Sequence, residues 1–246
     1  MKLILCIAVI ILTILSPTTT LTAALSEDSM KAVAAGQTSS GGHDLAQQLR
    51  SVRPDASFTN TGKMFIRVSR KQKWEVAYSC RVMVTATNWT SYYSAIRSNS
   101  ALPGFSIEHR PDADSVFRDD AGNALSPAQI NAPFAGSDFW LLDLGLDFLH
   151  WPAQRIVKWE MKRSFGCKVL ESKNPNPAPG SYSRVLSWIH EDTGAIIQAE
   201  AYDSRGKLLK EFRPTETEKV NGQRQLKEME MENAQTGSMT RLEFDL

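Results

Sequence analysis

Alternation of apolar and polar side chains constrains the fold of this chain more than any other feature. Within residues 74–86 every even position from Trp74 to Ala86 is apolar, whereas Glu75 and Arg81 lie on the odd positions. Successive side chains of a strand point to opposite faces of a sheet, so this pattern predicts a long half-buried strand. Residues 63–70 alternate in the same way, and the polar residues 71–73 between the two predict a hairpin.

The same period continues along most of the chain. Further strands are expected at 89–97, 104–109, 115–117, 155–165, 167–172, 182–190, 195–203, 207–213, 217–220, 223–232 and 239–244. Turn residues such as Asp203-Ser-Arg-Gly206 and Asn221-Gly222 separate them. Strands spaced about 8 to 12 residues apart and joined by hairpin turns predict one antiparallel meander that curls into a barrel or deep half-barrel. We expect a single domain over residues 43–246.

Helical spacing of apolar residues occurs in two regions, one before the first strand and one between the two series of strands. Leu45 and Leu49, four residues apart, predict a short amphipathic helix over 44–50. Ser126-Pro127 can begin another helix, and Ser137-Asp138 can cap a third that runs to residue 149 and stops at Trp151-Pro152. The fold class is therefore mainly β, of the α+β type.

The N-terminus has the pattern of a secretory signal peptide. Lys2 precedes an apolar run of about 13 residues, and small residues follow at Ala23 and Ala24. A bilayer span needs about 20 apolar residues, so an uncleaved anchor is the weaker interpretation. Cleavage is expected after Ala24, which makes 1–24 the signal peptide and 25–42 a flexible leader. Cys6 lies inside the apolar run, so the mature protein is expected not to be acylated.

Charge and metal-ligand content exclude several functions. The chain has 28 basic and 27 acidic residues, a formal charge of +1, which argues against nucleic acid as a partner. The 4 histidines and 3 cysteines form no close cluster, and no Gly-rich phosphate loop occurs. We expect neither a metal nor a cofactor.

Export leaves two cysteines, Cys80 and Cys167, in an oxidising compartment. They can form a disulfide, or each can be a buried free thiol.

The sequence contains only weak signals for catalytic residues. His43, His109, His150 and His190 are expected at the ends of elements or in the leader, and no Ser lies in a Gly-x-Ser-x-Gly elbow. Asp143 and Asp147, four residues apart, are expected on the solvated edge of a helix. The acids Glu228, Glu230 and Glu232 alternate with methionines and are expected on the solvent side of a strand. No catalytic residue is predicted, although a triad assembled across the fold would indicate an envelope hydrolase.

Residues 139–151 form the most apolar stretch after the signal peptide. A sheet curled around this stretch can pack into a solid core or leave an apolar cleft that the helix covers.

Four motifs, most of them in the second half of the chain, resemble the outer-membrane lipoprotein-sorting proteins, relatives of the LolA/LolB carriers. They are a Gly136-Ser-Asp-Phe segment leading into the apolar stretch, a Trp188-Ile-His-Glu-Asp-Thr turn, a Tyr202-Asp-Ser-Arg-Gly-Lys turn, and a Met231-Glu-Asn-Ala-Gln-Thr-Gly strand end. His190 stands where the family commonly has Asp.

The resemblance implies an unclosed antiparallel β-barrel with helices covering its open side and an apolar cavity for acyl chains. The cavity or lid residues would be Phe139, Trp140, Leu142, Leu146, Phe148, Leu149 and Trp151. The expected function is a non-enzymatic periplasmic carrier of acylated lipoprotein or another lipid, which implies inner- and outer-membrane sorting machinery as partners. The alternative is a cell-envelope structural or interaction protein with the same fold and a filled core.

Overall fold

A computed structural model describes residues 38–110, 112–220 and 222–246. These residues form one 12-stranded sheet in which all neighbouring strands are antiparallel. The strands of its first half are β1 (Phe58–Arg67), β2 (Lys73–Val84), β3 (Trp89–Arg97), β4 (Ser100–His109) and β5 (Val116–Asp119). Those of its second half are β6 (Ala153–Lys162), β7 (Phe165–Lys173), β8 (Arg184–His190), β9 (Ile196–Tyr202), β10 (Leu208–Val220), β11 (Gln223–Asn233) and β12 (Met239–Phe244).

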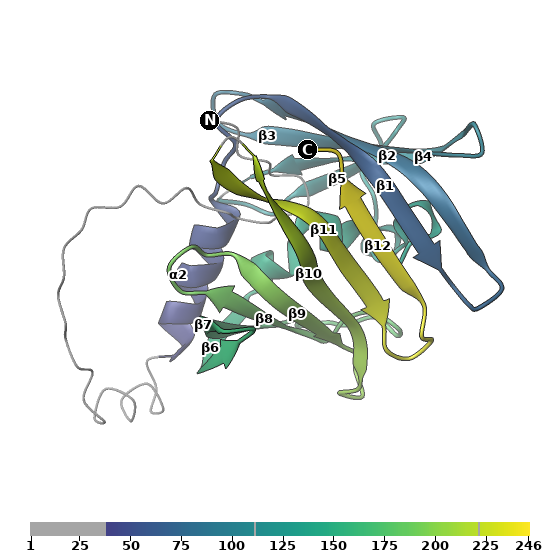
Figure 1. Cartoon of the computed structure of the whole chain (residues 1–246). Helices are drawn as coiled ribbons and strands as arrows, with labels where there is room; N and C mark the ends of the chain where they lie inside the picture. The colour runs from purple at the N-terminus through teal and green to yellow at the C-terminus, as the bar shows by residue number, and fades with distance from the viewer. Residues whose placement is uncertain (1–37, 111, 221) are drawn as a thin grey trace.

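The first strand of the sheet, β1, lies in its middle, between β2 and β12. The chain proceeds from β1 outward to β5 at one edge, crosses to β6 at the other edge, and returns strand by strand to β12, which pairs with β1. The sheet is strongly curved, with β3 and β4 at the top of Figure 1, β6–β9 at the bottom and β10–β12 between them. Because β5 and β6 do not pair with each other, the sheet is not closed. The predicted antiparallel meander is confirmed.

The alternation seen in the sequence decides which face is buried. In β2 the side chains of Val76, Tyr78 and Val82 are buried, and Met83 on the opposite face is 44% exposed. In β11 Met229 and Met231 are buried as expected. Several expected boundaries are wrong. The strand β1 begins at Phe58, β4 begins at Ser100 and β6 ends at Lys162. Residues 208–220 form the single strand β10, with register irregularities near Glu216.

Helix α2 (Thr38–Arg50) is longer than the predicted helix, so residues 38–42 of the expected leader are helical. It packs on the edge strand β6. A Cβ atom on Gly42 would lie 2.6 Å from the backbone of Arg155, so this close approach requires glycine. Among the described residues no helix is long and apolar enough to cross a membrane.

The connecting segment, residues 120–152, links the two edge strands. It contains α3 (Pro127–Ile130), η1 (Phe134–Gly136), α4 (Leu141–Gly145) and η2 (Asp147–His150). Ser126 caps α3 as predicted. The single helix predicted from residue 137 to 149 is wrong: the helix begins only after Trp140, and Leu146, with φ of 48°, ends it. An L-residue with this positive φ cannot continue a right-handed helix.

Two large apolar clusters fill the interior, and the connecting segment contributes to both. Phe134, Phe139 and Leu144 pack with residues of β1–β5, β11 and β12. Leu142, Phe148 and Leu149 pack with residues of α2 and β7–β10. The segment therefore joins the interiors of the two halves of the sheet.

The disulfide considered between Cys80 and Cys167 does not form, because Cys167 is a buried free thiol. Cys80 belongs to the cluster of the first half of the sheet, whereas Cys167 packs with Val169 and Trp188 in a separate small cluster. The two cysteines therefore lie in different parts of the interior.

Candidate functional site

The connecting segment is tied to the sheet by buried polar groups around Asp138. Its carboxylate accepts hydrogen bonds from the hydroxyls of Ser238 at 2.5 Å and Thr240 at 2.9 Å, at the start of β12. Its backbone N–H donates to the Thr240 hydroxyl at 2.8 Å. Asp138 thus joins residues 102 positions apart in the chain.

Asp143 anchors the next turn of the segment. Its carboxylate accepts from the Trp140 backbone N–H at 2.8 Å and from the Tyr182 hydroxyl at 2.9 Å. The first of these bonds caps the N-terminus of α4. The rings of Trp140 and Tyr182 stack with centroids 4.6 Å apart. The expectation that Asp143 lies on a solvated edge is wrong, because its side chain turns into the interior and is 9% exposed.

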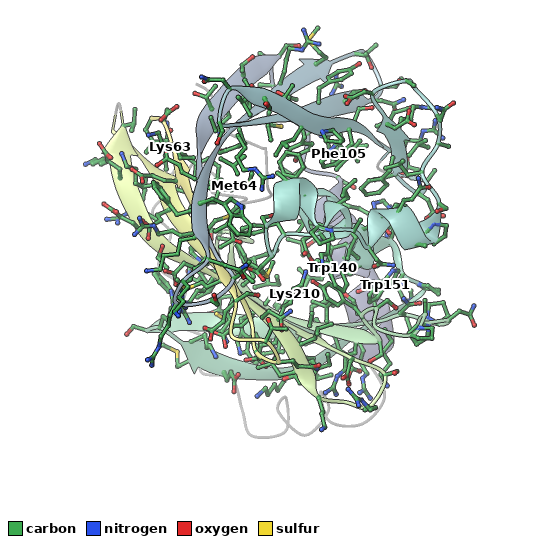
Figure 2. All side chains as sticks on the ribbon, turned by 90° about the vertical axis from the view of Figure 1, so that its right-hand side faces the viewer. Lys63, Met64, Phe105, Trp140, Trp151 and Lys210 are labelled. Atoms are coloured by element: carbon green, nitrogen blue, oxygen red, sulfur yellow. The ribbon has the colours of Figure 1, made fainter. Side chains whose placement is uncertain are left out.

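Lys210 of β10 completes this polar cluster and is 2% exposed. Its ammonium group donates to the Asp138 carbonyl at 2.6 Å and lies 3.4 Å from the Asp143 carboxylate. The same nitrogen lies 3.6 Å from the centroid of the Trp140 ring, a cation–π contact. Figure 2 shows Trp140 and Lys210 close together between the upper and lower parts of the sheet.

Burial dominates the electrostatics of the pair. It lowers the pKa of Lys210 to about 8, against the opposing effect of Asp143. It raises the pKa of Asp143, and the nearby Lys210 only partly offsets this. Both shifts have the sign expected when charged groups leave water. The pair therefore binds the segment at a high desolvation cost.

An apolar pocket lies directly beside Lys210 and Asp143. Its volume is about 40 Å³. The connecting segment contributes one wall, and the facing strands β8–β11, together with Tyr182 just before β8, contribute the rest. The lining residues are Phe139, Asp143, Leu146, Phe148, Tyr182, Val185, Ile196, Ala199, Ala201, Lys210, Phe212 and Met231.

The residues predicted for a cavity or lid fall into three groups. Phe139, Leu146 and Phe148 line the pocket. Leu142 and Leu149 are buried in the second apolar cluster. The half-buried Trp140 lies over Lys210, and Trp151 packs edge-on against Phe148.

The opposite wall of the pocket and the buried ion pair were not foreseen. A signal for Lys210 does exist, since it lies two positions before Phe212 in a strand and shares its inward face. For Asp143 the signal is its position three residues after Trp140, where an acid can cap a helix.

Three histidines contact hydroxyl groups. His109 Nε2 lies 3.0 Å from the Ser91 hydroxyl, and His150 Nε2 lies 3.4 Å from that of Ser115. Both rings line a second pocket of about 50 Å³. Burial lowers the pKa of His109 to about 3, which makes its ring a weak base. His190 contacts the Thr193 hydroxyl rather than a serine.

These contacts do not complete a catalytic triad. Among the hydrogen bonds and ion pairs of the described residues, no carboxylate orients His109 or His150, as a Ser-His-acid site would require. The described residues also contain no group of three or more His, Cys, Asp or Glu side chains that could hold a metal ion.

Comparison with known proteins adds the fold relationship. No curated protein matches the chain. A family model described as "-like: Uncharacterized protein" matches residues 122–245, half of the chain.

Three solved structures share the fold. A DUF1329 family protein from Desulfovibrio piger is 18% identical, with a TM-score of 0.67 over 84% of this chain and 90% of that one. An outer membrane lipoprotein-sorting protein domain from Vibrio parahaemolyticus is 17% identical, with a TM-score of 0.68 over 84% and 91%. A LolA superfamily protein from Nitrosomonas europaea is 16% identical, with a TM-score of 0.55 over 86% and 93%.

The resemblance seen in the sequence motifs is thus confirmed in the fold. The chain belongs to the family matched over residues 122–245, and its fold is that of the LolA superfamily and the outer membrane lipoprotein-sorting proteins.

Proposed function

We propose that this protein is a non-enzymatic periplasmic carrier that binds the acyl chains of lipoproteins or other lipids. The acyl chain of the ligand binds between the concave face of the sheet and the connecting segment, which covers the open side. The observation that carries the proposal is the apolar pocket between Phe139, Leu146 and Phe148 on the segment and the strands β8–β11. The lipoprotein-sorting and LolA superfamily neighbours have the same fold.

In this conformation the pocket is too small for an acyl chain. A water molecule needs about 10–15 Å³ on this measure, so about 40 Å³ accommodates only a few waters. Binding therefore requires the connecting segment to move outward. The segment suits this role because its helices are short and interrupted at Leu146.

The energetics allow such an opening. Each methylene removed from water contributes about 0.8 kcal/mol, so ten methylenes contribute roughly 8 kcal/mol before costs are subtracted. That exceeds the about 3–5 kcal/mol typical of breaking one buried ion pair. The acyl chain then occupies the space that the apolar side chains of the segment leave, and its own buried contacts replace theirs.

Export and partners follow from the same proposal. Residues 1–24 are the signal peptide, cleaved near Ala24, and the sorting machinery of the inner and outer membranes delivers and receives the cargo. The hydrophobic effect that binds the acyl chain is non-directional, so the protein can accept several acylated cargo proteins.

The substitution that tests the site is Leu146→Asp. Leu146 has a positive φ, a conformation that Asp adopts more readily than Leu, so the variant is expected to fold. A charge in the apolar wall should abolish uptake of a fluorescent fatty acid. Ile96→Asp, at a residue 52% exposed, is the matched control and should bind normally. Normal uptake by a folded Leu146→Asp protein would remove this segment from the site.

The alternative is a cell-envelope interaction protein with a filled core, favoured by the small pocket volume. Native mass spectrometry of residues 25–246 purified from a bacterial host separates the two. Co-purified lipid or acylated peptide supports the carrier. A clean apo mass, together with no uptake of the fatty acid, supports the interaction protein.

A further inference from the structure

On the concave face of β1 and β2, the polar side chains of Asn60 and Tyr78 are neighbours that both lack hydrogen-bond partners. Asn60 and Tyr78 are each 4% exposed. Among the described residues, neither the amide nitrogen and oxygen of Asn60 nor the hydroxyl of Tyr78 has a hydrogen-bond partner. Buried polar groups in native proteins are nearly always paired, and an unpaired one is costly. A buried asparagine that lacks both a donor and an acceptor interaction therefore points to a ligand.

The two side chains are neighbours in the sheet. Gly62 is opposite Tyr78, and Asn60 is opposite Cys80, so Asn60 and Tyr78 occupy diagonal positions on one face. A Cβ atom on Gly62 would lie 2.7 Å from Cε1 of Tyr78, so the glycine makes room for the tyrosine ring. Phe244 holds the ring from β12 in an edge-on contact, with centroids 6.2 Å apart.

Together the two groups offer a defined set of hydrogen bonds. The Asn60 amide supplies a donor and an acceptor. The Tyr78 hydroxyl stays protonated near neutral pH, because burial raises its pKa, and it can donate. A secondary amide complements this set, since its carbonyl can accept while its N–H donates to Asn60. An ester offers only acceptors, and a hydrocarbon chain offers nothing.

We propose that Asn60 and Tyr78 bind the polar linkage of the acylated ligand, and that they prefer a secondary amide. The inference rests on the proposed carrier function and assigns the position of the cargo within it. The acyl chain then extends along β1 over Met64 toward Ile66, roughly 20 Å from Asn60 along an extended strand. Ile66 is level with Thr240 and Met231, and Met231 lines the apolar pocket.

The path between the two ends is adaptable. Met64 and Met229 lie on it, and both are fully buried in the cluster of the first half. Methionine side chains rearrange at low cost, so they can yield to an entering chain.

The test compares two fluorescent probes that carry the same alkyl chain and fluorophore. One is joined by a secondary amide and the other by an ether, which lacks the carbonyl and N–H. The variants are Asn60→Leu and Tyr78→Phe, with Thr59→Val on the outer face of β1 as the control. We expect each inner variant to bind the amide probe about three- to tenfold more weakly. Binding of the ether probe should be unchanged, and the control should match the wild type for both probes.

Thermal unfolding without ligand provides the second readout. Replacing an unpaired buried polar group by an apolar one of similar shape should leave Tm unchanged or raise it. A lowered Tm with normal amide binding would make the two groups purely structural and overturn the inference. Equal weakening of both probes would overturn it as well. If the wild-type protein binds neither probe, the proposed carrier function is refuted. If it binds both probes and the variants bind the amide probe as tightly as the wild type does, only the inference about the linkage is refuted.

Discussion

Replacing Lys210 with methionine tests whether the buried ion pair holds the connecting segment in place. Methionine keeps most of the apolar stem but removes the ammonium group that contacts Asp138 and Asp143. Asp143 is then a buried carboxylate without its cation, and breaking a buried pair in this way costs about 3–5 kcal/mol.

The structure limits this cost. Asp143 keeps its bonds to the Trp140 N–H and the Tyr182 hydroxyl. It can also take up a proton, which from an ordinary pKa of about 3.9 costs about 4 kcal/mol at pH 7. We therefore expect Lys210→Met to lower the free energy of unfolding by about 3 kcal/mol at pH 7.

The pH dependence has a definite sign. Removing Lys210 raises the folded-state pKa of Asp143 further above its unfolded value, so the variant loses more stability than the wild type as pH rises above about 4. At pH 5 the proton costs only about 1.5 kcal/mol, and the loss should shrink to about that size. Adding Asp143→Asn removes the charge and should recover most of the stability at pH 7.

Urea unfolding followed by tryptophan fluorescence at pH 5 and pH 7 measures these differences. A loss below about 1 kcal/mol at pH 7 would refute the role of the pair. A loss that grows toward pH 5 would refute the assignment to Asp143.

Three further predictions concern packing and titration. Gly42→Ala should destabilise the protein by about 1–3 kcal/mol in urea unfolding, because the new Cβ meets the Arg155 backbone at 2.6 Å. The matched control Gly41→Ala, whose nearest contact would be 3.6 Å away, should be neutral or stabilising. Burial and Asp114 raise the pKa of Asp147 to about 6, so the wild type loses stability as pH rises from about 4 to 6. Asp147→Asn lacks the titrating carboxyl and should not lose this stability. The free energy of unfolding of the variant, compared with that of the wild type, should therefore increase by up to about 3 kcal/mol between pH 4 and pH 7. Burial raises the pKa of the Cys167 thiol, so Cys167 should react slowly with a thiol reagent in the native protein and fully in urea, as peptide mass spectrometry can follow.

The features of the fold that depend on local sequence could be predicted. The alternation in residues 74–86 and 223–232 identified β2 and β11 and their buried faces, because the period of two depends only on backbone geometry. The turn residues placed most hairpins for the same reason. The motifs after residue 136 pointed to the correct fold relatives, and the family match covers the same half of the chain.

The connecting segment was predicted less well. Its composition indicated one amphipathic helix with Asp143 and Asp147 in water. In the structure Gly145 lies against Phe117, where a Cβ would be 2.7 Å from the ring, and Leu146 turns the chain out of the helix. Packing between both halves of the sheet overrides helix propensity there, and no local pattern reports that constraint.

The sequence alone thus determines the strands, their inward faces and their antiparallel order, because these follow from side-chain alternation and short turns. Only the tertiary structure decides what those faces enclose. It pairs β1 with β12, places Lys210 against Asp143 across 67 residues, separates Cys80 from Cys167, and leaves the polar side-chain atoms of Asn60 and Tyr78 without hydrogen-bond partners. Each of these depends on how strongly the sheet curves and where the connecting segment crosses it, and such long-range geometry is set by the packing of the whole interior.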